Sequence, residues 1–279
     1  IKNTKKNEDQ YEMIKKYQFN LRDFSYLKKI CSKYKREYLC SIFDVKTLKL
    51  IKKLNFKRYK IPSGEITNYH LLSELGKMNK EIILSTGMST IKEIKNAIGL
   101  LIKSGTSKKN ISLLHCHSSY PTLPHNVNLL AMKTLKKKFK INVGYSDHTT
   151  DIETPIAAVA LGAKIIEKHF TLDNNSKGPD HKSSLNPKNF ERMITAIRKA
   201  ESILGSSIKY PQKEELKNKK FVRKSIVATK YIKKNERLNS KNISLKRPGT
   251  GVQGDKWFKI LNKKSSKDYR PGEMIKEKI

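Results

Sequence analysis

Short apolar runs alternate with longer amphipathic stretches through the first 200 residues of the chain. Runs rich in β-branched and aromatic residues predict buried strands, and apolar residues at helical spacing predict helices between them. The expected strands are Tyr38–Phe43, Arg58–Ile61, Glu81–Leu84, Ile111–Cys116, Ile141–Gly144 and Lys164–Phe170. The expected helices are 7–17, Leu21–Tyr34, Val45–Leu54, Tyr69–Met78, Ile91–Lys103, Asn128–Phe139, Pro155–Leu161 and Asn186–Leu204. This alternation is typical of a parallel sheet built from βαβ units.

Each expected strand ends in a cluster of polar residues. The clusters lie near Ser41 and at 60–65, 85–90, 117–120, 146–148 and 167–169. Polar residues after every strand are the pattern of the active face of a (β/α)₈ TIM-type barrel, whereas an open doubly wound sheet does not require them. Because six strands are two short of eight and the chain starts with Ile1, we expect the first two βα units to lie upstream of it.

The composition changes after residue 204. Residues 205–221 are polar and predict a linker, whereas 222–279 contain short β-like runs separated by turns. We therefore expect a partial TIM barrel domain over 1–204, the linker over 205–221, and a small, mostly β domain over 222–279. About 60 residues is close to the lower size limit for independent folding.

The chain is strongly basic, with 60 Lys and Arg against 25 Asp and Glu, a net charge of +35. Such a charge often indicates a nucleic-acid partner, but these lysines are scattered through every segment and no nucleic-acid-binding motif is visible. Three cysteines without a C-x-x-C pair indicate a reducing cytoplasm. No apolar run approaches the roughly 18 residues of a membrane span, so we expect a cytoplasmic protein without a membrane partner.

Two histidines stand one strand–helix period apart. His148 follows the strand that begins at Ile141, and His169 lies near the end of the next strand along the chain. Carboxyl ends of neighbouring parallel strands meet at one edge, so both imidazoles can converge there. Two imidazoles, water and a substrate oxygen suit a divalent metal with open positions, and Asp147 or Glu167 can accept a hydrogen bond from an imidazole.

Seven motifs resemble the N-acetylneuraminate (sialic acid) synthase family: I-P-S-G-E-I, S-T-G-M-S-T, H-C-H-S-S-Y-P-T, G-Y-S-D-H-T, I-E-K-H-F-T-L-D, G-P-D-H-K-S-S and K-R-P-G-T-G-V. The resemblance implies a (β/α)₈ barrel followed by an antifreeze-protein-like (SAF) β domain. It also implies condensation of phosphoenolpyruvate with an open-chain N-acyl hexosamine and water, giving a nine-carbon 2-keto acid and phosphate. A divalent ion, Mn²⁺ or Mg²⁺, and a homodimer with exchanged carboxyl-terminal domains are further implications.

The resemblance also implies roles for individual residues. Phosphoenolpyruvate would contact Ser41, Lys60, Ser63, Ser85, Ser118 and Ser146, where Ser118 stands at a position that is often Asn in the family. The sugar would contact Tyr120, Asp180, Phe221 and Arg247, with Arg247 reaching the N-acyl group from the small domain. The metal ligands would be His148 and His169, and the catalytic carboxylates Glu65 and Glu167. Glu65 would orient or deprotonate the water that captures the cationic adduct.

Several alternatives stay open on the sequence alone. Glu65 can instead cap the following helix, and Arg247 can be an ordinary turn residue. The G-Y-S-D-H and G-P-D-H-K motifs indicate the sialic or legionaminic branch, but a pseudaminic acid synthase or another phosphoenolpyruvate–aldose synthase shares the chemistry. A chain that lacks two βα units can be inactive, and a basic polyanion-binding protein is the alternative outside enzymes. The motifs do not distinguish N-acetylmannosamine from a diacetamido sugar.

Overall fold

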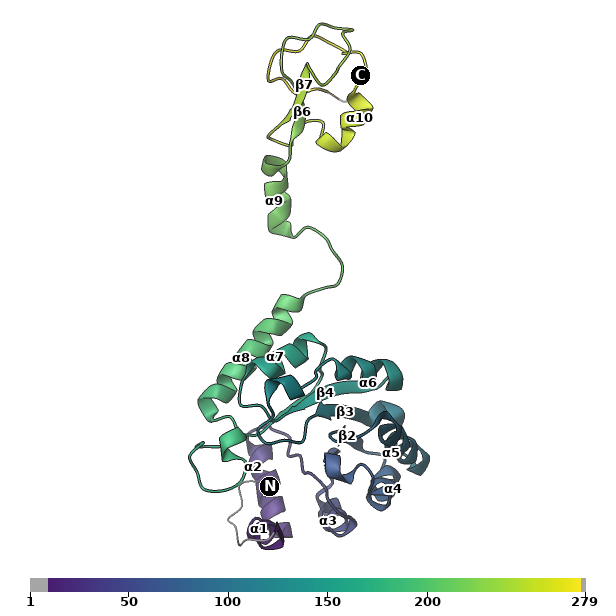
Figure 1. The fold of residues 1–279 in the computed structure, drawn as a ribbon, viewed down its shortest axis with the longest axis vertical. Coiled ribbons are helices and arrows are strands. Elements are labelled where there is room, and N and C mark those ends of the chain that lie inside the picture. The colour runs from purple at the N-terminus through teal and green to yellow at the C-terminus, as the bar shows by residue number, and fades with distance from the viewer. Residues whose placement is uncertain (1–9, 277–279) are drawn as a thin grey trace. The chain divides into compact units, whose positions relative to one another are not determined.

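The computed structural model describes residues 10–276, which divide after Gly205 into two compact units. The first unit contains a five-stranded parallel sheet in the order β1-β2-β3-β4-β5, of which Figure 1 labels β2, β3 and β4. Its strands are β1 (Arg58–Ile61), β2 (Glu81–Ser85), β3 (Ile111–Cys116), β4 (Asn142–Asp147) and β5 (Ile166–Lys168). Neighbours in sequence are neighbours in the sheet, which is the order of a (β/α) barrel rather than of a doubly wound sheet.

Helices separate and flank these strands (Figure 1). They are α1 (Gln10–Lys16), α2 (Leu21–Lys33), α3 (Val45–Ile51), α4 (Tyr69–Lys77), α5 (Ile91–Ser104), α6 (Ala131–Phe139), α7 (Glu153–Ala160) and α8 (Pro187–Leu204). Each overlaps a predicted helix, although residues 7–9 of the first prediction lie outside the described residues. None of the helices within 10–276 is both long and apolar enough to span a membrane.

Local capping fixes where two of the helices begin. Thr90 and Glu93 form a reciprocal capping box at α5, in which each side chain accepts a hydrogen bond from the other residue's backbone N–H. At α8 the Asn186 side chain accepts from the backbone N–H of Asn189, and Pro187 occupies the first helical position. These local signals explain why the predicted starts of α5 and α8 agree closely with the observed ones.

Side chains alternate between two faces of the sheet. Residues such as Tyr59, Leu84 and Leu113 are fully buried and pack in one cluster with apolar residues of the surrounding helices. The residues between them, Lys60 and Ser85 among others, face the opposite side. One face of the sheet therefore carries the apolar core residues, and the opposite face carries polar side chains.

The outermost predicted strand is shorter than expected. Of Tyr38–Phe43, only Ser41 forms a bridge, to Lys60, although Ile42 N–H also donates to the Lys60 carbonyl at 2.9 Å. Among the described residues, no strand pairs with the side of this segment that faces away from β1. The segment is therefore the edge of the sheet and forms few backbone hydrogen bonds with it. At the other end of the sheet, Phe170 bridges Leu185 in parallel. The arrangement confirms a TIM-barrel-like sheet with a half-barrel of regular strands.

The second unit has its own small core. An antiparallel pair, β6 (Ser225–Ala228) and β7 (Ile243–Lys246), packs with α10 (Trp257–Ile260) and with bridged segments near Ile232, Tyr269 and Met274. This confirms a mostly β carboxyl-terminal module. Besides the β6–β7 ladder, the described residues of this module pair through single bridges.

The predicted polar linker over 205–221 is not wholly irregular. It contains most of helix α9 (Lys213–Val222), which starts with a capping box between Gln212 and Glu215. None of the α9 residues is buried, so the helix carries no apolar stripe that periodicity could reveal. The linker stays a prediction, and its polar composition did not reveal the helix within it.

The close approach of β4 to the segment before β5 predicts a sensitive glycine. A Cβ on Gly144 would lie 2.3 Å from the Ile165 carbonyl oxygen and 2.8 Å from a Leu114 methyl carbon. Because backbone would have to move, Gly144→Ala should lower the free energy of unfolding by about 1–3 kcal/mol or more, measured by urea denaturation.

The matched control is Gly99 in α5, where a Cβ meets nothing within 4 Å. Gly99→Ala should leave stability unchanged or raise it by up to about 1 kcal/mol, because alanine favours the helix. Equal denaturation midpoints for Gly144→Ala and the parent protein would contradict the close packing of these strands.

Candidate active site

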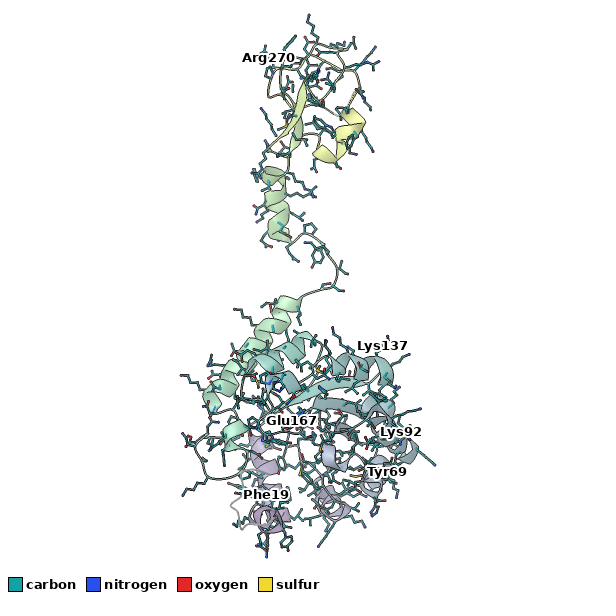
Figure 2. All side chains as sticks on the ribbon, viewed as in Figure 1. Phe19, Tyr69, Lys92, Lys137, Glu167 and Arg270 are labelled. Atoms are coloured by element: carbon teal, nitrogen blue, oxygen red, sulfur yellow. The ribbon has the colours of Figure 1, made fainter. Side chains whose placement is uncertain are left out.

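Polar side chains gather on the face of the sheet opposite the core. Lys60, Ser85, Ser146 and Glu167 come from four different strands, and Ser146 lies directly opposite Glu167 in the register of β4 and β5. Figure 2 labels Glu167 within this part of the first unit. Since alternate residues share a face, these four side chains face the same side of the sheet.

Glu167 binds two of the predicted anion-binding residues. Its carboxylate lies 3.3 Å from the Lys60 ammonium and accepts a hydrogen bond of 3.1 Å from the Ser146 hydroxyl. The Lys60 side chain is only 5% exposed, whereas that of Glu167 is 40% exposed. A buried ammonium needs a compensating charge, and Glu167 supplies it.

Ser85 is buried and its hydroxyl has no hydrogen-bond partner among the described residues. Buried polar groups are rarely left unpaired, and an unpaired one on the same face as a buried ammonium is a feature of an anion site. This hydroxyl is thus available to a ligand that also reaches Lys60.

A second group of hydroxyls gathers around the backbone of Gly87. Its N–H donates to the Ser63 hydroxyl at 3.0 Å, and the same hydroxyl lies 3.1 Å from the Cys116 thiol. A Cβ on Gly87 would come within 3.0 Å of Ser63, Cys116 and Ser118 side-chain atoms. Only glycine leaves room for these three side chains to converge, which makes Gly87 and Cys116 site neighbours that the motifs alone did not identify.

Glu65 lies beside the start of α4. Its carboxylate accepts a hydrogen bond of 2.7 Å from the Asn68 amide, and the Asn68 amide oxygen in turn accepts from the backbone N–H of Leu71. Glu65 therefore supports the cap of α4 through Asn68 rather than capping the helix itself. An amide donor leaves lone pairs of the carboxylate free for other partners.

His148, His169 and Tyr120 form a compact group of rings. The His148 and His169 ring centroids are 5.2 Å apart, and Tyr120 lies 4.1 Å from His148 and 5.5 Å from His169. Burial raises the pKa of Tyr120, so its hydroxyl stays protonated at neutral pH. The predicted convergence of the two imidazoles is present in the structure.

The hydrogen bond of His148 fixes its tautomer. Its Nδ1 lies 2.6 Å from the His117 carbonyl oxygen, which only accepts, so Nδ1 donates and the neutral ring keeps its lone pair on Nε2. Burial lowers the pKa of His148 and favours that neutral form. The expected acceptor was a carboxylate, Asp147 or Glu167, and this expectation was wrong for His148.

A neutral imidazole with an oriented N–H is the form in which histidine binds metals, so His148 is in a form that fits a divalent ion, with the His169 ring beside it. Residues 10–276 contain no group of three or more His, Cys, Asp or Glu side chains that could hold a metal. The protein would therefore supply two imidazoles and leave further positions to water or substrate.

Asp180 completes the rim next to His169. Its carboxylate lies 3.9 Å from His169 Nδ1, and its backbone has a φ of 65°, which is uncommon outside glycine. The Asp180 carbonyl accepts hydrogen bonds from the Ser183 and Ser184 hydroxyls. These two bonds hold the unusual backbone conformation and direct the loop that carries Asp180.

Asp147 has a different partner from the one expected. It is fully buried and pairs with the buried ammonium of Lys168 at 2.5 Å. Sequence reasoning missed Lys168 because a lysine in a chain so rich in lysine carries little signal. The alternation of side chains along β5 was the available clue. It places Lys168 on the core face of the sheet, and Glu167 and His169 on the opposite face.

Phe221 and Arg247 belong to the second unit. The guanidinium Nε of Arg247 donates to the Val222 carbonyl at 2.9 Å, beside Phe221 at the end of α9. The Phe221 side chain is 70% exposed. Within this unit, the two predicted sugar-binding residues therefore lie close together on the surface.

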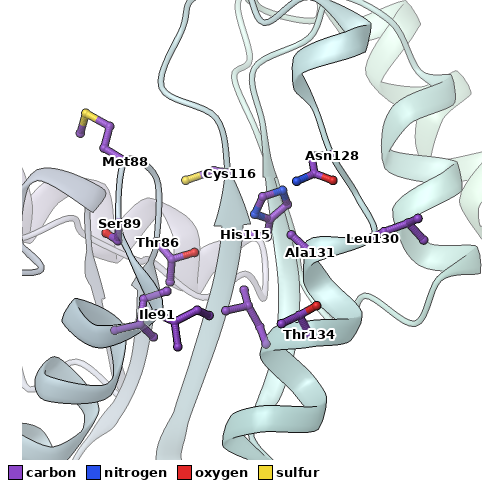
Figure 3. A pocket seen from close by; sticks show the side chains of 12 residues that line it. Thr86, Met88, Ser89, Ile91, His115, Cys116, Asn128, Leu130, Ala131 and Thr134 are labelled. Carbon is purple, nitrogen blue, oxygen red and sulfur yellow. The ribbon is translucent and has the colours of Figure 1, made fainter.

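A separate hollow lies between α5 and α6 (Figure 3). It is lined by Thr86, Met88, Ser89, Ile91, Ile94, His115, Cys116, Asn128, Leu130, Ala131, Thr134 and Leu135. The His115 Nε2 is 2.9 Å from the Val127 carbonyl oxygen, and burial lowers the pKa of this ring. None of the predicted site residues lines this hollow, although Cys116, which contacts the Ser63 hydroxyl, does.

Comparisons with known proteins agree with the fold and the motifs. The NeuB family model matches residues 1–209, and the SAF domain model matches 223–278. The chain is 44% identical over 277 residues to the N,N'-diacetyllegionaminic acid synthase of Campylobacter jejuni, covering 99% of this chain and 83% of that protein. It is 36% identical over 237 residues to a pseudaminic acid synthase of Campylobacter jejuni, covering 85% and 68%.

Among solved structures, the N-acetylneuraminic acid (sialic acid) synthetase of Leptospira borgpetersenii, in complex with citrate, is similar. It shares 34% identity, has a TM-score of 0.71, and the match covers 76% of this chain and 74% of that one. These findings confirm the predicted resemblance and fold. The chain belongs to the NeuB family and carries a SAF domain.

Proposed function

We propose that this protein condenses phosphoenolpyruvate with an open-chain N-acyl hexosamine and water, releasing phosphate and a nine-carbon 2-keto acid. Its family and its relatives, which are named legionaminic, pseudaminic and sialic acid synthases, support this proposal. The chain is a synthase of this family. A cytoplasmic location is part of the same proposal, as phosphoenolpyruvate is a cytoplasmic metabolite.

One observation carries the proposal: a buried ammonium and an unpaired buried hydroxyl share the polar face of the sheet. Lys60 and Ser85 supply them, and Ser41, Ser63, Ser118 and Ser146 lie around the same strand ends. Phosphoenolpyruvate has a phosphate and a carboxylate, so it needs a cation and several donors in a small space. We assign its binding to these six residues.

In the proposed reaction, the methylene carbon of phosphoenolpyruvate attacks the aldehyde carbon of the sugar, and the aldehyde oxygen takes up a proton from solvent to become a hydroxyl. Water then adds to the cationic carbon that carries the phosphate, and the bond to phosphate breaks to leave the ketone. Glu65 takes the proton of that water, because one amide donor leaves its carboxylate free to act as a base. Glu167 holds Lys60 and Ser146 in place.

His148 and His169 would hold a divalent ion, Mn²⁺ or Mg²⁺. The ion would polarise the aldehyde oxygen and stabilise the charge that develops on it. Tyr120 lies against both imidazoles and Asp180 borders His169, so we assign these two residues to sugar hydroxyl groups. The neutral tautomer of His148 supports this assignment, because its Nε2 lone pair is free.

We propose a diacetamido sugar as the substrate rather than N-acetylmannosamine. The support is the 44% identity to a synthase whose named product carries two N-acetyl groups. We further propose a homodimer in which the carboxyl-terminal domain of one subunit covers the barrel of the other. Arg247 and the exposed Phe221 at the end of α9 would then meet the N-acyl end of the sugar.

The function is tested with the purified protein, supplied with phosphoenolpyruvate, Mn²⁺ and either sugar. We expect sugar-dependent phosphate release and formation of a 2-keto acid, with a higher kcat/KM for the diacetamido sugar. Lys60→Met should raise KM for phosphoenolpyruvate about 10- to 100-fold, because it removes a charged contact.

Lys92→Met, an exposed lysine of α5, is the matched control and should leave kinetics unchanged. Phosphate release that does not depend on any sugar would refute the proposed condensation. Equal KM values for Lys60→Met and Lys92→Met would remove Lys60 from the anion site.

A second prediction concerns Glu65. Glu65→Gln keeps an oxygen that can accept from Asn68, so the cap of α4 and the thermal stability should persist. If Glu65 acts as the base, kcat should fall about 10²- to 10⁴-fold while KM for phosphoenolpyruvate changes little. Glu93→Gln, which alters a carboxylate that only caps α5, is the control. A parent-like kcat for Glu65→Gln would reduce Glu65 to a structural role.

A third prediction tests the exchanged domains. Arg247→Ala and His148→Ala should each be inactive alone, yet co-expression should restore activity, because a mixed dimer contains one site with both natural residues. Random pairing sets the ceiling at about a quarter of normal activity. If mixed dimers form and remain inactive while both parents fold, Arg247 does not act on the partner's site.

A further inference from the structure

A buried ion pair joins the carboxyl ends of β4 and β5. The Asp147 and Lys168 side chains are 0% and 1% exposed, and their charged atoms are 2.5 Å apart. Both residues lie on the side of the sheet that carries the core, opposite the polar face of Lys60 and Glu167. A buried pair of this kind seldom raises stability over a well-packed apolar pair, so its presence needs another explanation.

The position of the pair relates it to the two histidines. Asp147 lies directly opposite Lys168 in the register of β4 and β5. His148 follows Asp147 and His169 follows Lys168, so each ion-pair member immediately precedes one imidazole. The pair therefore ties the two strands together one residue before the histidines leave them.

Lys168 also holds the segment that follows His148. Its ammonium donates to the Thr149 carbonyl at 2.6 Å and to the Asp151 carbonyl at 3.2 Å, and it contacts the Thr149 hydroxyl at 3.3 Å. Asp147 accepts from the Thr149 backbone N–H at 2.9 Å and from its hydroxyl at 3.1 Å. His148 is thus fixed on both sides, at Asp147 and at Thr149, while its own Nδ1 donates to His117.

We propose that Asp147 and Lys168 are positioning residues that set the spacing and orientation of the His148 and His169 imidazoles. A metal site needs its ligands held within fractions of an ångström, and rigid support behind the ligands provides this. A fully satisfied ionic network gives one geometry, whereas apolar packing at the same place would tolerate several. The inference rests on the proposed function, because it concerns residues assigned there to the metal.

The test variant is the double substitution Asp147→Asn, Lys168→Met, which removes both charges and leaves no unpaired buried charge. The metal-free protein is examined first, by ¹⁵N NMR of the histidine rings. The His148 Nδ1–H signal, present in the parent protein, should broaden or shift in the double variant. Mn²⁺ affinity, measured by calorimetry, should then fall about 10- to 100-fold, the usual effect of disturbing groups behind metal ligands.

The matched control is a second cross-strand ion pair. Arg58 and Glu81 are also register partners, on β1 and β2, with their charged atoms 3.2 Å apart, but at the amino ends of the strands. Arg58→Met, Glu81→Gln should leave the His148 signal and Mn²⁺ affinity unchanged even where it lowers the Tm. This separates positioning from a general loss of stability.

Each outcome of these experiments either supports or overturns the positioning role of Asp147 and Lys168. A folded double variant with the parent's His148 signal and Mn²⁺ affinity would overturn the inference, and so would equal losses in the Arg58 and Glu81 control. If the double variant does not fold, Thr149→Val is used instead, because it removes only the hydroxyl that both charges contact. It should change the His148 signal and Mn²⁺ affinity in the same direction by smaller amounts. An unchanged signal and affinity in Thr149→Val would also overturn the inference. If parent and His148→Ala bind Mn²⁺ equally, the proposed metal site is wrong, and the His148 signal alone decides the positioning role.

Discussion

Alternation of side chains along in-register parallel strands is the constraint on which the first unit depends. It assigns Tyr59, Leu84 and Leu113 to the core and gives the opposite face to Lys60, Ser85, Ser146 and Glu167. A shift of one residue in any strand would bury the polar set and expose the core. Fold stability and site geometry therefore rest on the same register, which is why close packing at Gly144 matters to both.

The sequence predicted the elements whose signals are local. β1 and β3 begin and end where expected, and Thr90 and Asn186 mark the starts of two helices through their side-chain caps. It failed where the deciding partner is distant or where no apolar pattern exists. Tyr38–Phe43 looks like a strand but forms one bridge, and α9 forms without burying any residue.

The same distinction explains the candidate site. The spacing of His148 and His169 follows from one βαβ unit, so their convergence could be predicted. The partner of His148 could not, because the His117 carbonyl comes from the end of a different strand. Asp147 was one of two residues expected to accept a hydrogen bond from an imidazole, yet adjacent strand residues face opposite sides, and its partner Lys168 lies on the core side.

The contact between Lys60 and Glu167 has a consequence for ligand selection. The Glu167 carboxylate already compensates the charge of the Lys60 ammonium, so an anion bound at the proposed site would share that ammonium with Glu167 instead of meeting a free positive charge. A ligand with a single weak charge gains little binding free energy from a shared ammonium. A ligand with two anionic groups that also engages the unpaired Ser85 hydroxyl can compensate for this loss. At the proposed site, sharing of this kind would favour a ligand with two anionic groups over a monocarboxylate.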